Sequence, residues 1–132
     1  IFMVGFFTFL LSFYLTKNFW ASAVSGLLLI FSPVFLDKKT HIQILSIQWI
    51  PLSILFFLIF TNNFKTRYLF LSLLFFLLQF YNSFLPAYFL IFYYIIHLLF
   101  IWIGERKLLK KIFTKNNLLI TLLSILLIIP II

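Results

Sequence analysis

Long apolar runs, separated only by short polar breaks, are the feature that most limits what this chain can fold into. The breaks fall at about residues 17–18, 37–41, 61–67, 82–83 and 104–117. Because 65% of the residues are hydrophobic and only 9% are charged, too little polar surface remains to cover a water-soluble particle of 132 residues. The sequence therefore predicts a multi-pass protein of the cell membrane.

The runs between the breaks predict an all-α fold, a polytopic transmembrane helix bundle with about six hydrophobic segments. The third, from about Thr40 to Phe60, has the roughly 20 residues that cross ~30 Å of hydrocarbon. The run Tyr68–Ile103 is too long for one crossing, and Asn82-Ser83 is its natural break. Ile1 is not a start residue and the chain ends inside an apolar run. We therefore expect both ends to be truncated and residues 1–132 to be part of one transmembrane domain, with no separate soluble domain.

The distribution of basic residues predicts how these segments are oriented. With six segments, Lys38 and Lys39 fall on one side of the membrane and the other eight basic residues on the opposite side. The positive-inside rule makes the side with eight cytoplasmic. A single crossing of Tyr68–Ile103 would give seven against three, so charge alone favours two crossings. Because the basic residues lie in short loops, the net charge of +8 predicts membrane lipids with anionic head groups as partners, and no nucleic acid.

The segment Asp37–Leu52, on the predicted extracytoplasmic side, gathers the candidate site residues. Thr40 and the glutamine three residues later fit a capping box at the start of a helix. In such a helix His41 and Gln48 lie two turns apart on one face, and Pro51 is expected to kink the span. Polar groups in hydrocarbon need partners. For this face the partners are either neighbouring helices or a polar or phosphorylated substrate in a cavity.

The rest of the segment adds further candidates. Gln43, Ser46 and Ser53 lie on nearly the opposite helical face, where the same two alternatives hold. Lys38 and Lys39 run against the positive-inside bias, and they either bind a phosphate group or stay solvated beside lipid head groups. The predicted substrate-binding residues are therefore Lys38, Lys39, His41, Gln43 and Gln48.

Small and polar residues elsewhere predict helix packing. Ser22 and Gly26 are four residues apart, which places small side chains on one stripe where a neighbouring helix can approach closely. Ser72, Gln79 and Ser83 likewise fall on one helical stripe. That stripe suits either helix pairing or a cavity wall, and we favour pairing.

Motifs that would identify an enzyme by themselves are missing. His97 lies deep in an apolar run with Tyr93 and Tyr94 one turn before it, so a phenol–imidazole hydrogen bond is expected to satisfy it. Asp37 and His41 are two residues only, which is too few for a metal site. The chain has no glycine-rich phosphate loop and no serine–histidine–acid set. We predict no catalytic residue and no metal ligand here, and the sequence indicates no particular cofactor.

Four motifs, in order, carry a resemblance to a known family. Phe31-Ser32-Pro33 follows a helix rich in small residues, His41-x-Gln43 comes next, and Gln48-Trp49-Ile50-Pro51-Leu52 follows. Leu78-Gln79-Phe80-Tyr81-Asn82-Ser83 then precedes an aromatic-rich span. This order resembles the early membrane core of bacterial and archaeal GT-C type glycosyltransferases, similar to the dolichyl-phosphate-mannose protein mannosyltransferase group. The resemblance covers roughly residues 19–100.

The resemblance implies an enzyme that transfers sugar from a polyprenyl-phosphate donor to an acceptor on the extracytoplasmic face, with a lipid-linked sugar donor as partner. In that family an acidic residue of the first extracytoplasmic loop serves as catalytic base. That loop would lie upstream of Ile1, so no catalytic residue is carried onto this chain. His41, Gln43 and Trp49 correspond to recurrent motif positions. Two other classes stay open: a secondary transporter or lipid flippase, whose spans also carry kinks and midplane polar groups, and a non-enzymatic assembly subunit.

Overall fold

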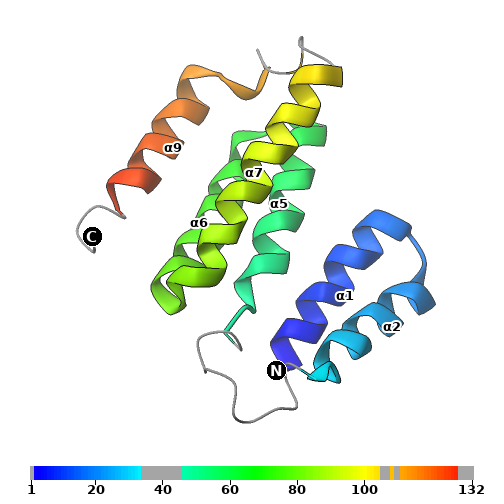
Figure 1. Cartoon of the computed structure of the whole chain (residues 1–132). Coiled ribbons are helices and arrows are strands. Elements are labelled where there is room, and N and C mark those ends of the chain that lie inside the picture. Colours follow the sequence, from blue (N-terminus) through cyan, green and yellow to red (C-terminus); the bar gives the residue numbers. More distant parts are fainter. Residues whose placement is uncertain (1, 34–45, 105–107, 109–110, 128–132) are drawn as a thin grey trace.

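The computed structural model describes residues 2–33, 46–104, 108 and 111–127, and the regular structure within them is entirely α-helical. The all-α prediction is confirmed. Six helices of 12 residues or more follow one another in the described ranges (Figure 1). They are α1 (Phe2–Thr16), α2 (Phe19–Ile30), α5 (Trp49–Asn63), α6 (Thr66–Asn82), α7 (Phe84–Gly104) and α9 (Lys115–Leu126).

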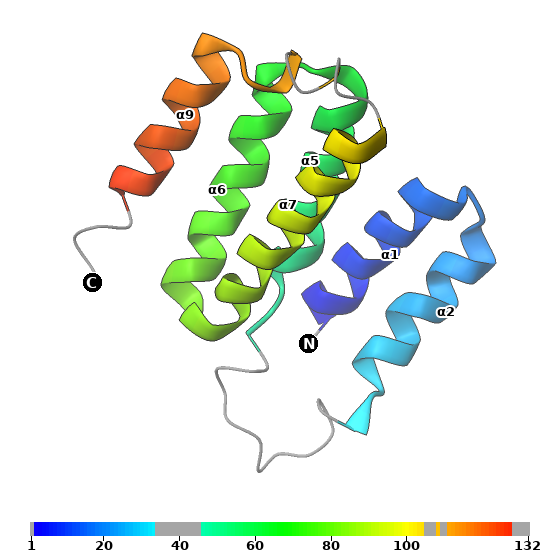
Figure 2. The same cartoon turned by 45° about the horizontal axis from the view of Figure 1, so that its top comes forward.

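Successive helices run in opposite directions, so that the chain passes up and down through the molecule (Figures 1 and 2). The helices α5, α6 and α7 form the centre. The α1/α2 hairpin packs on one side of it through α1 against α5, and α9 packs on the other side against α6. The Asn62 side-chain amide donates to the Tyr14 hydroxyl at 2.8 Å, which ties the last turn of α5 to that of α1.

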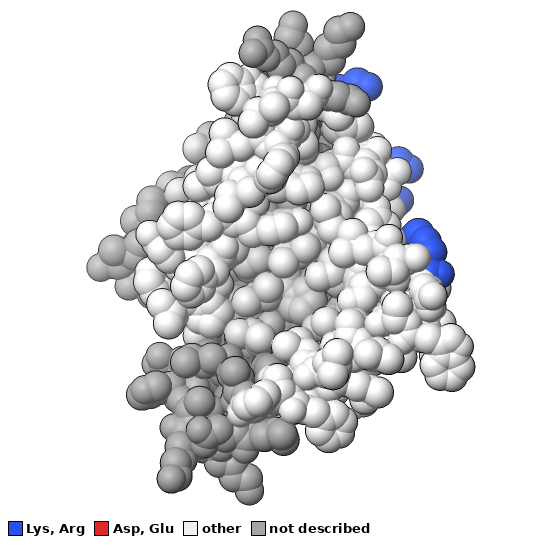
Figure 3. All heavy atoms as spheres, turned by 45° about the vertical axis from the view of Figure 1, so that its right-hand side comes forward, with Lys and Arg blue, Asp and Glu red and all other residues white. Residues whose placement is uncertain are grey.

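This alternation collects the described basic residues at one end of the bundle, which we call the basic end. It holds the described lysines and arginine at the ends of α1 and α5 and at the starts of α6 and α9: Lys17, Lys65, Arg67, Lys111 and Lys115. In Figure 3 their atoms lie along one edge, and the rest of the visible described surface carries no charged side chain. The grouping of basic residues that the sequence predicts is thus seen in the described part of the chain.

One described helix, α7, is long and apolar enough to cross a membrane. Its 21 residues extend about 31 Å at 1.5 Å per residue, and an 18-residue stretch of it has a mean hydropathy of 2.1. The apolar helices α1, α2, α5 and α9 have 12 to 15 residues, which is shorter than a full crossing.

The break between α6 and α7 falls where the sequence predicts it. Ser83 is extended and separates the two helices, and Pro86 is the third residue of α7. A proline in the first turn is tolerated because the amide there has no partner within the helix. The turn between α5 and α6 is shorter than expected. It consists of Phe64, with a left-handed φ of 55°, and Lys65, while Asn63 still ends α5.

The predicted helix from Thr40 to Phe60 is wrong at residues 46–48, which are not helical, while its first residues, 40–45, lie outside the described residues. The helix α5 starts only at Trp49, and Gln48 is its N-cap residue without a side-chain capping bond. Pro51 therefore sits in the first turn, where it starts the helix instead of kinking it. The Ile47 carbonyl, which can receive no hydrogen bond from Pro51, accepts from the Ile50 amide at 3.2 Å. Gln48 consequently lies in a turn, and Ser46 shares no helical face with Ser53; His41, which was predicted to share a face with Gln48, lies outside the described residues.

The α1/α2 hairpin is held by close backbone approach, as the small residues predict. Gly26 lies so near α1 that a Cβ atom there would come within 2.7 Å of the Gly5 carbonyl oxygen. The Ser25 hydroxyl donates to the Ser12 hydroxyl across the same interface at 2.7 Å. The contact therefore depends on glycine for space and on serine for a bond between helices.

Replacing Gly26 by valine is expected to separate α1 from α2, because the new side chain would overlap α1 backbone, which cannot rotate away. We expect a loss of about 1–3 kcal/mol in the free energy of unfolding, measured by denaturant titration in detergent. Ala21→Val is the control, since Ala21 lies exposed on the same helix. Equal stability of the two variants would contradict the close contact.

Candidate functional site

A buried polar cluster at the centre of the bundle joins its three central helices. The Ser53 hydroxyl donates to the Ser72 carbonyl at 2.7 Å, and the Ser72 hydroxyl donates to the Ser53 carbonyl at 2.8 Å. The Tyr94 hydroxyl of α7 lies 2.6 Å from the Ser53 hydroxyl and 3.0 Å from that of Ser72. Every hydroxyl of the cluster has a protein partner, so we interpret it as a structural link between α5, α6 and α7.

This central cluster decides two sequence predictions. The helix pairing that we favoured for the stripe of Ser72, Gln79 and Ser83 is confirmed at Ser72, which bonds directly to α5. The expected hydrogen bond from Tyr94 to His97 is wrong, since the Tyr94 hydroxyl is engaged by the two serines. The His97 ring instead packs against the rings of Phe57 and Tyr93, with centroid distances of 5.4 and 5.8 Å.

A second polar cluster lies at the end of the bundle opposite the basic end. We call it the Ser46 cluster, and it consists of Ser46, Gln79, Asn82 and Ser83. The side-chain amides of Gln79 and Asn82 both donate to the Ser46 carbonyl, at 2.6 and 3.2 Å. The end of α6 is thereby bound to the segment that leads into α5.

Two buried polar atoms of the Ser46 cluster lack a partner among the described residues: the Gln79 Oε1 atom and the Ser83 hydroxyl. Gln79 is 0% exposed and Ser83 is 6% exposed. The Gln79 nitrogen must face the Ser46 carbonyl, because a carbonyl only accepts, and the amide oxygen is therefore the free atom. An unpaired buried polar group costs about 1–3 kcal/mol. Such atoms require an explanation, and a ligand or an ordered water supplies one.

The residues predicted to bind substrate lie in and around this end of the chain. Gln48 is half-buried and two residues after Ser46, in the turn before α5. Lys38, Lys39, His41 and Gln43 fall within residues 34–45, outside the described residues, as does the predicted capping box. In the sequence Gln79 and Ser83 belonged to a stripe suited to helix pairing or to a cavity wall, and neither residue was predicted to bind substrate. The available signal was their spacing of four residues at the predicted break between two helices.

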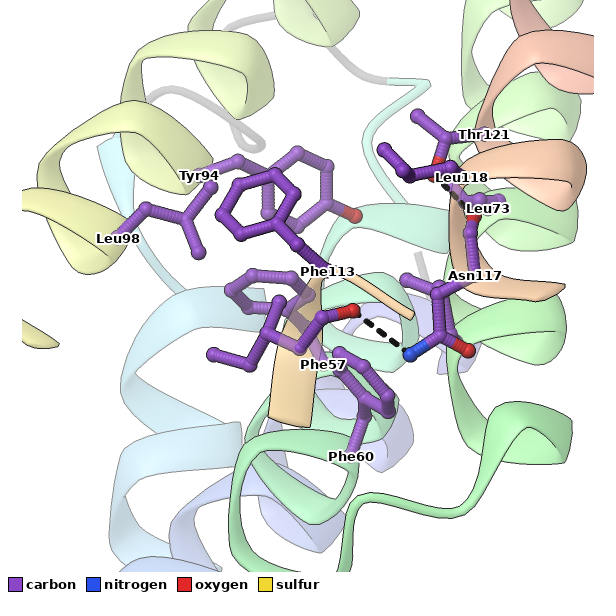
Figure 4. Close-up of a pocket in the computed structure, with 11 residues that line it drawn as sticks. Phe57, Phe60, Leu73, Tyr94, Leu98, Phe113, Asn117, Leu118 and Thr121 are labelled. Carbon is purple, nitrogen blue, oxygen red and sulfur yellow. Dashed lines mark hydrogen bonds between the residues drawn. The ribbon is translucent and has the colours of Figure 1, made fainter. Parts of the chain in front are cut away.

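An apolar cavity lies nearer the basic end, between α5, α6, α7 and α9 (Figure 4). Its volume is about 160 Å³, and its walls include Phe57, Phe60 and Tyr94. The Asn117 amide nitrogen donates to the Ile112 carbonyl at 2.8 Å, and its buried oxygen has no partner in the described part of the chain. The polar side chains in its walls are those of Tyr94, Asn117 and Thr121, and the described ranges contain no group of three metal-binding side chains.

Tyr94→Phe tests the central cluster, because it removes a hydroxyl that bonds to two helices. We expect the free energy of unfolding to fall by about 1 kcal/mol, measured by denaturant titration in detergent. Tyr93→Phe is the matched control on the neighbouring residue, whose ring makes packing contacts with Phe57 and His97. A larger loss in the Tyr93 variant would show that the serines do not use Tyr94 as a link.

Comparison of the chain with protein families, with characterised proteins and with solved structures finds no match. The function is therefore argued from the residues and their arrangement.

Proposed function

We propose that the chain is a multi-pass membrane protein whose basic end faces the cytoplasm. Its alternating helices support this, because they gather the described positive charge at one end. The outward faces support it as well, since large apolar side chains such as Leu28, Phe89 and Phe100 are exposed on several helices. An apolar surface of this extent is suited to lipid. The helices shorter than α7 then require local thinning of the bilayer, or ends that lie among the head groups.

Single cysteines test this arrangement, since the chain has no cysteine of its own. An impermeant maleimide applied to intact cells is expected to label Lys38→Cys, on the extracytoplasmic side, and to leave Lys65→Cys unlabelled until the cells are permeabilised. If α7 alone crossed the membrane, residues 38 and 65 would lie on the same side. Equal labelling of both variants in intact cells would therefore contradict the multi-pass proposal.

We further propose that the chain forms part of the membrane core of a glycosyltransferase that uses a polyprenyl-phosphate-linked sugar. The observation that carries this proposal is the Ser46 cluster. It joins Ser46, two residues before the Gln48–Leu52 motif, to the Leu78–Ser83 motif, and these two motifs are separate parts of the family resemblance. Both motifs then meet on the extracytoplasmic side of the proposed topology, where transfer to the acceptor takes place.

The chemistry of the Ser46 cluster suits a sugar hydroxyl. The free Gln79 Oε1 atom accepts a hydrogen bond, and the Ser83 hydroxyl both donates and accepts. A sugar hydroxyl also does both, so it is a chemically suitable partner for either unpaired atom. In this proposal the cluster contributes to the wall of the donor cavity, and it performs no bond-making step.

Ser83→Ala separates binding from stability at this site. The substitution removes an unpaired hydroxyl, so we expect the free energy of unfolding to stay constant or to rise in the absence of ligand. We also expect the Kd for a polyprenyl-phosphate hexose to rise about five- to ten-fold, which corresponds to one lost hydrogen bond. Titration of the full chain in detergent measures binding.

Ser22→Ala is the control for this experiment. Ser22 is also buried, but its hydroxyl donates to the Asn18 carbonyl at 2.7 Å, at the basic end of the bundle. Donor affinity is expected to be unchanged in this variant. An unchanged affinity in Ser83→Ala would return the Ser46 cluster to a structural role. Movement of lipid-linked sugar across the bilayer by the unmodified chain in vesicles would instead favour a flippase.

A further inference from the structure

The helices α6 and α9 lie side by side at the outside of the bundle (Figures 1 and 2). An open apolar groove runs between them. Its volume is about 490 Å³, which is within the usual range of small-molecule sites. We call it the α6/α9 groove, and its walls are formed chiefly by Phe70, Leu74, Leu77, Ile120, Leu123 and Leu127. At the end of the groove away from the basic end, the Tyr81 hydroxyl donates to the Leu127 carbonyl at 2.8 Å, and this bond links α6 to the end of α9.

The other end of the groove opens toward positive charge. Arg67 lies three residues before Phe70, and therefore one turn above it on the same stripe of α6. Lys115 begins α9, the helix that forms the second wall. The helix α6 begins at the basic end, so its first backbone amides point toward that end. Its N-cap residue, Lys65, makes no side-chain bond to them.

Arg67 retains donors for an anion although it already has one partner. One of its terminal nitrogens donates to the Tyr68 hydroxyl at 2.9 Å, and the guanidinium carbon lies 4.7 Å from the centre of that ring. A guanidinium has five N–H donors, so the remaining ones are available to a phosphate group. The ring contact fixes the direction of the side chain without neutralising its charge.

The length of the groove matches one leaflet of a bilayer. Ten residues separate Arg67 from Leu77, which corresponds to about 15 Å along a helix. Half of a hydrocarbon core of ~30 Å is the same length. A phosphate at Arg67 would thus place an acyl chain along the apolar walls.

We propose that the α6/α9 groove binds an anionic phospholipid of the cytoplasmic leaflet, with its phosphate at Arg67 and Lys115 and one acyl chain between the helices. The inference rests on the membrane orientation proposed above, and it is independent of the sugar-transfer activity. A second copy of this chain is the less favourable occupant. In the same membrane orientation it would bring its own basic end against this one, and the charges would repel.

Native mass spectrometry of the full chain, purified in detergent and titrated with lipid, tests the proposal. The probes are phosphatidylglycerol and phosphatidylcholine with identical acyl chains. We expect phosphatidylglycerol to bind more tightly, and Arg67→Gln to weaken it about five-fold, the factor that corresponds to ~1 kcal/mol for one basic residue near an anionic surface. Lys17→Gln is the charge control, because Lys17 follows the last residue of α1, on the side of the bundle opposite α9. Its ammonium group lies 4.6 Å from the centre of the Tyr14 ring.

Filling the groove provides a second variant that keeps every charge. Leu74→Trp places a larger side chain in the groove, and we expect it to weaken phosphatidylglycerol at least as strongly as Arg67→Gln. Leu78→Trp is the matched control one turn further along α6. The two leucines are 38% and 39% exposed, and of the two only Leu74 lines the groove. Both tryptophan variants must retain helical circular dichroism, which excludes a loss of fold.

Three results would overturn the proposal. Equal binding of the two lipids by the unmodified chain would remove the role of the basic end. Unchanged phosphatidylglycerol affinity in both Arg67→Gln and Leu74→Trp would place the lipid elsewhere. A dimer in the mass spectrum that Leu74→Trp dissociates and Leu78→Trp does not would assign the groove to a second copy. Each result is obtained without any sugar donor, so it is separate from the outcome of the Ser83→Ala experiment.

Discussion

The reciprocal bond between Ser53 and Ser72 is the contact on which the rest of the structure depends. Each hydroxyl donates to the other residue's backbone carbonyl, at 2.7 and 2.8 Å, so α5 and α6 are joined by two bonds at one point of closest approach. Small side chains allow that approach, and Tyr94 extends the link to α7. The α1/α2 hairpin then has a surface of α5 to pack against, and α9 has one of α6.

Sequence reasoning predicted the helices, their breaks and the packing stripes because apolar runs and glycine, serine and proline signals are local. It failed at the start of α5, where Pro51 both permits a kink and marks a first turn, and only the surrounding packing decides between these. It also misjudged His97, because the partner of a tyrosine hydroxyl depends on which helix lies opposite. The serines that bind Tyr94 are 22 and 41 residues away in the chain, beyond the reach of a local pattern.

The candidate site could be predicted only in part for a related reason. The sequence indicated a polar stripe on α6 and a polar segment before α5, and each was treated alone. Their meeting at the Ser46 carbonyl depends on the tertiary arrangement. The Gln79 oxygen is unpaired because the bond from the Gln79 nitrogen to the Ser46 carbonyl fixes the orientation of the amide. The predicted ligands Lys38, Lys39, His41 and Gln43 lie outside the described residues and stay predictions.

The hairpins of the bundle have a consequence for its biosynthesis. The α1/α2 pair has its own glycine contact and its own serine bond. The α5/α6 pair has the reciprocal bond between Ser53 and Ser72, so each pair has bonds that do not require the other pair. A translating ribosome delivers these pairs in order. Each of these two pairs can close on itself as soon as it is delivered. The α1/α2 pair and the α5/α6 pair then dock through α1 and α5. The Asn62–Tyr14 bond is formed only at that second stage.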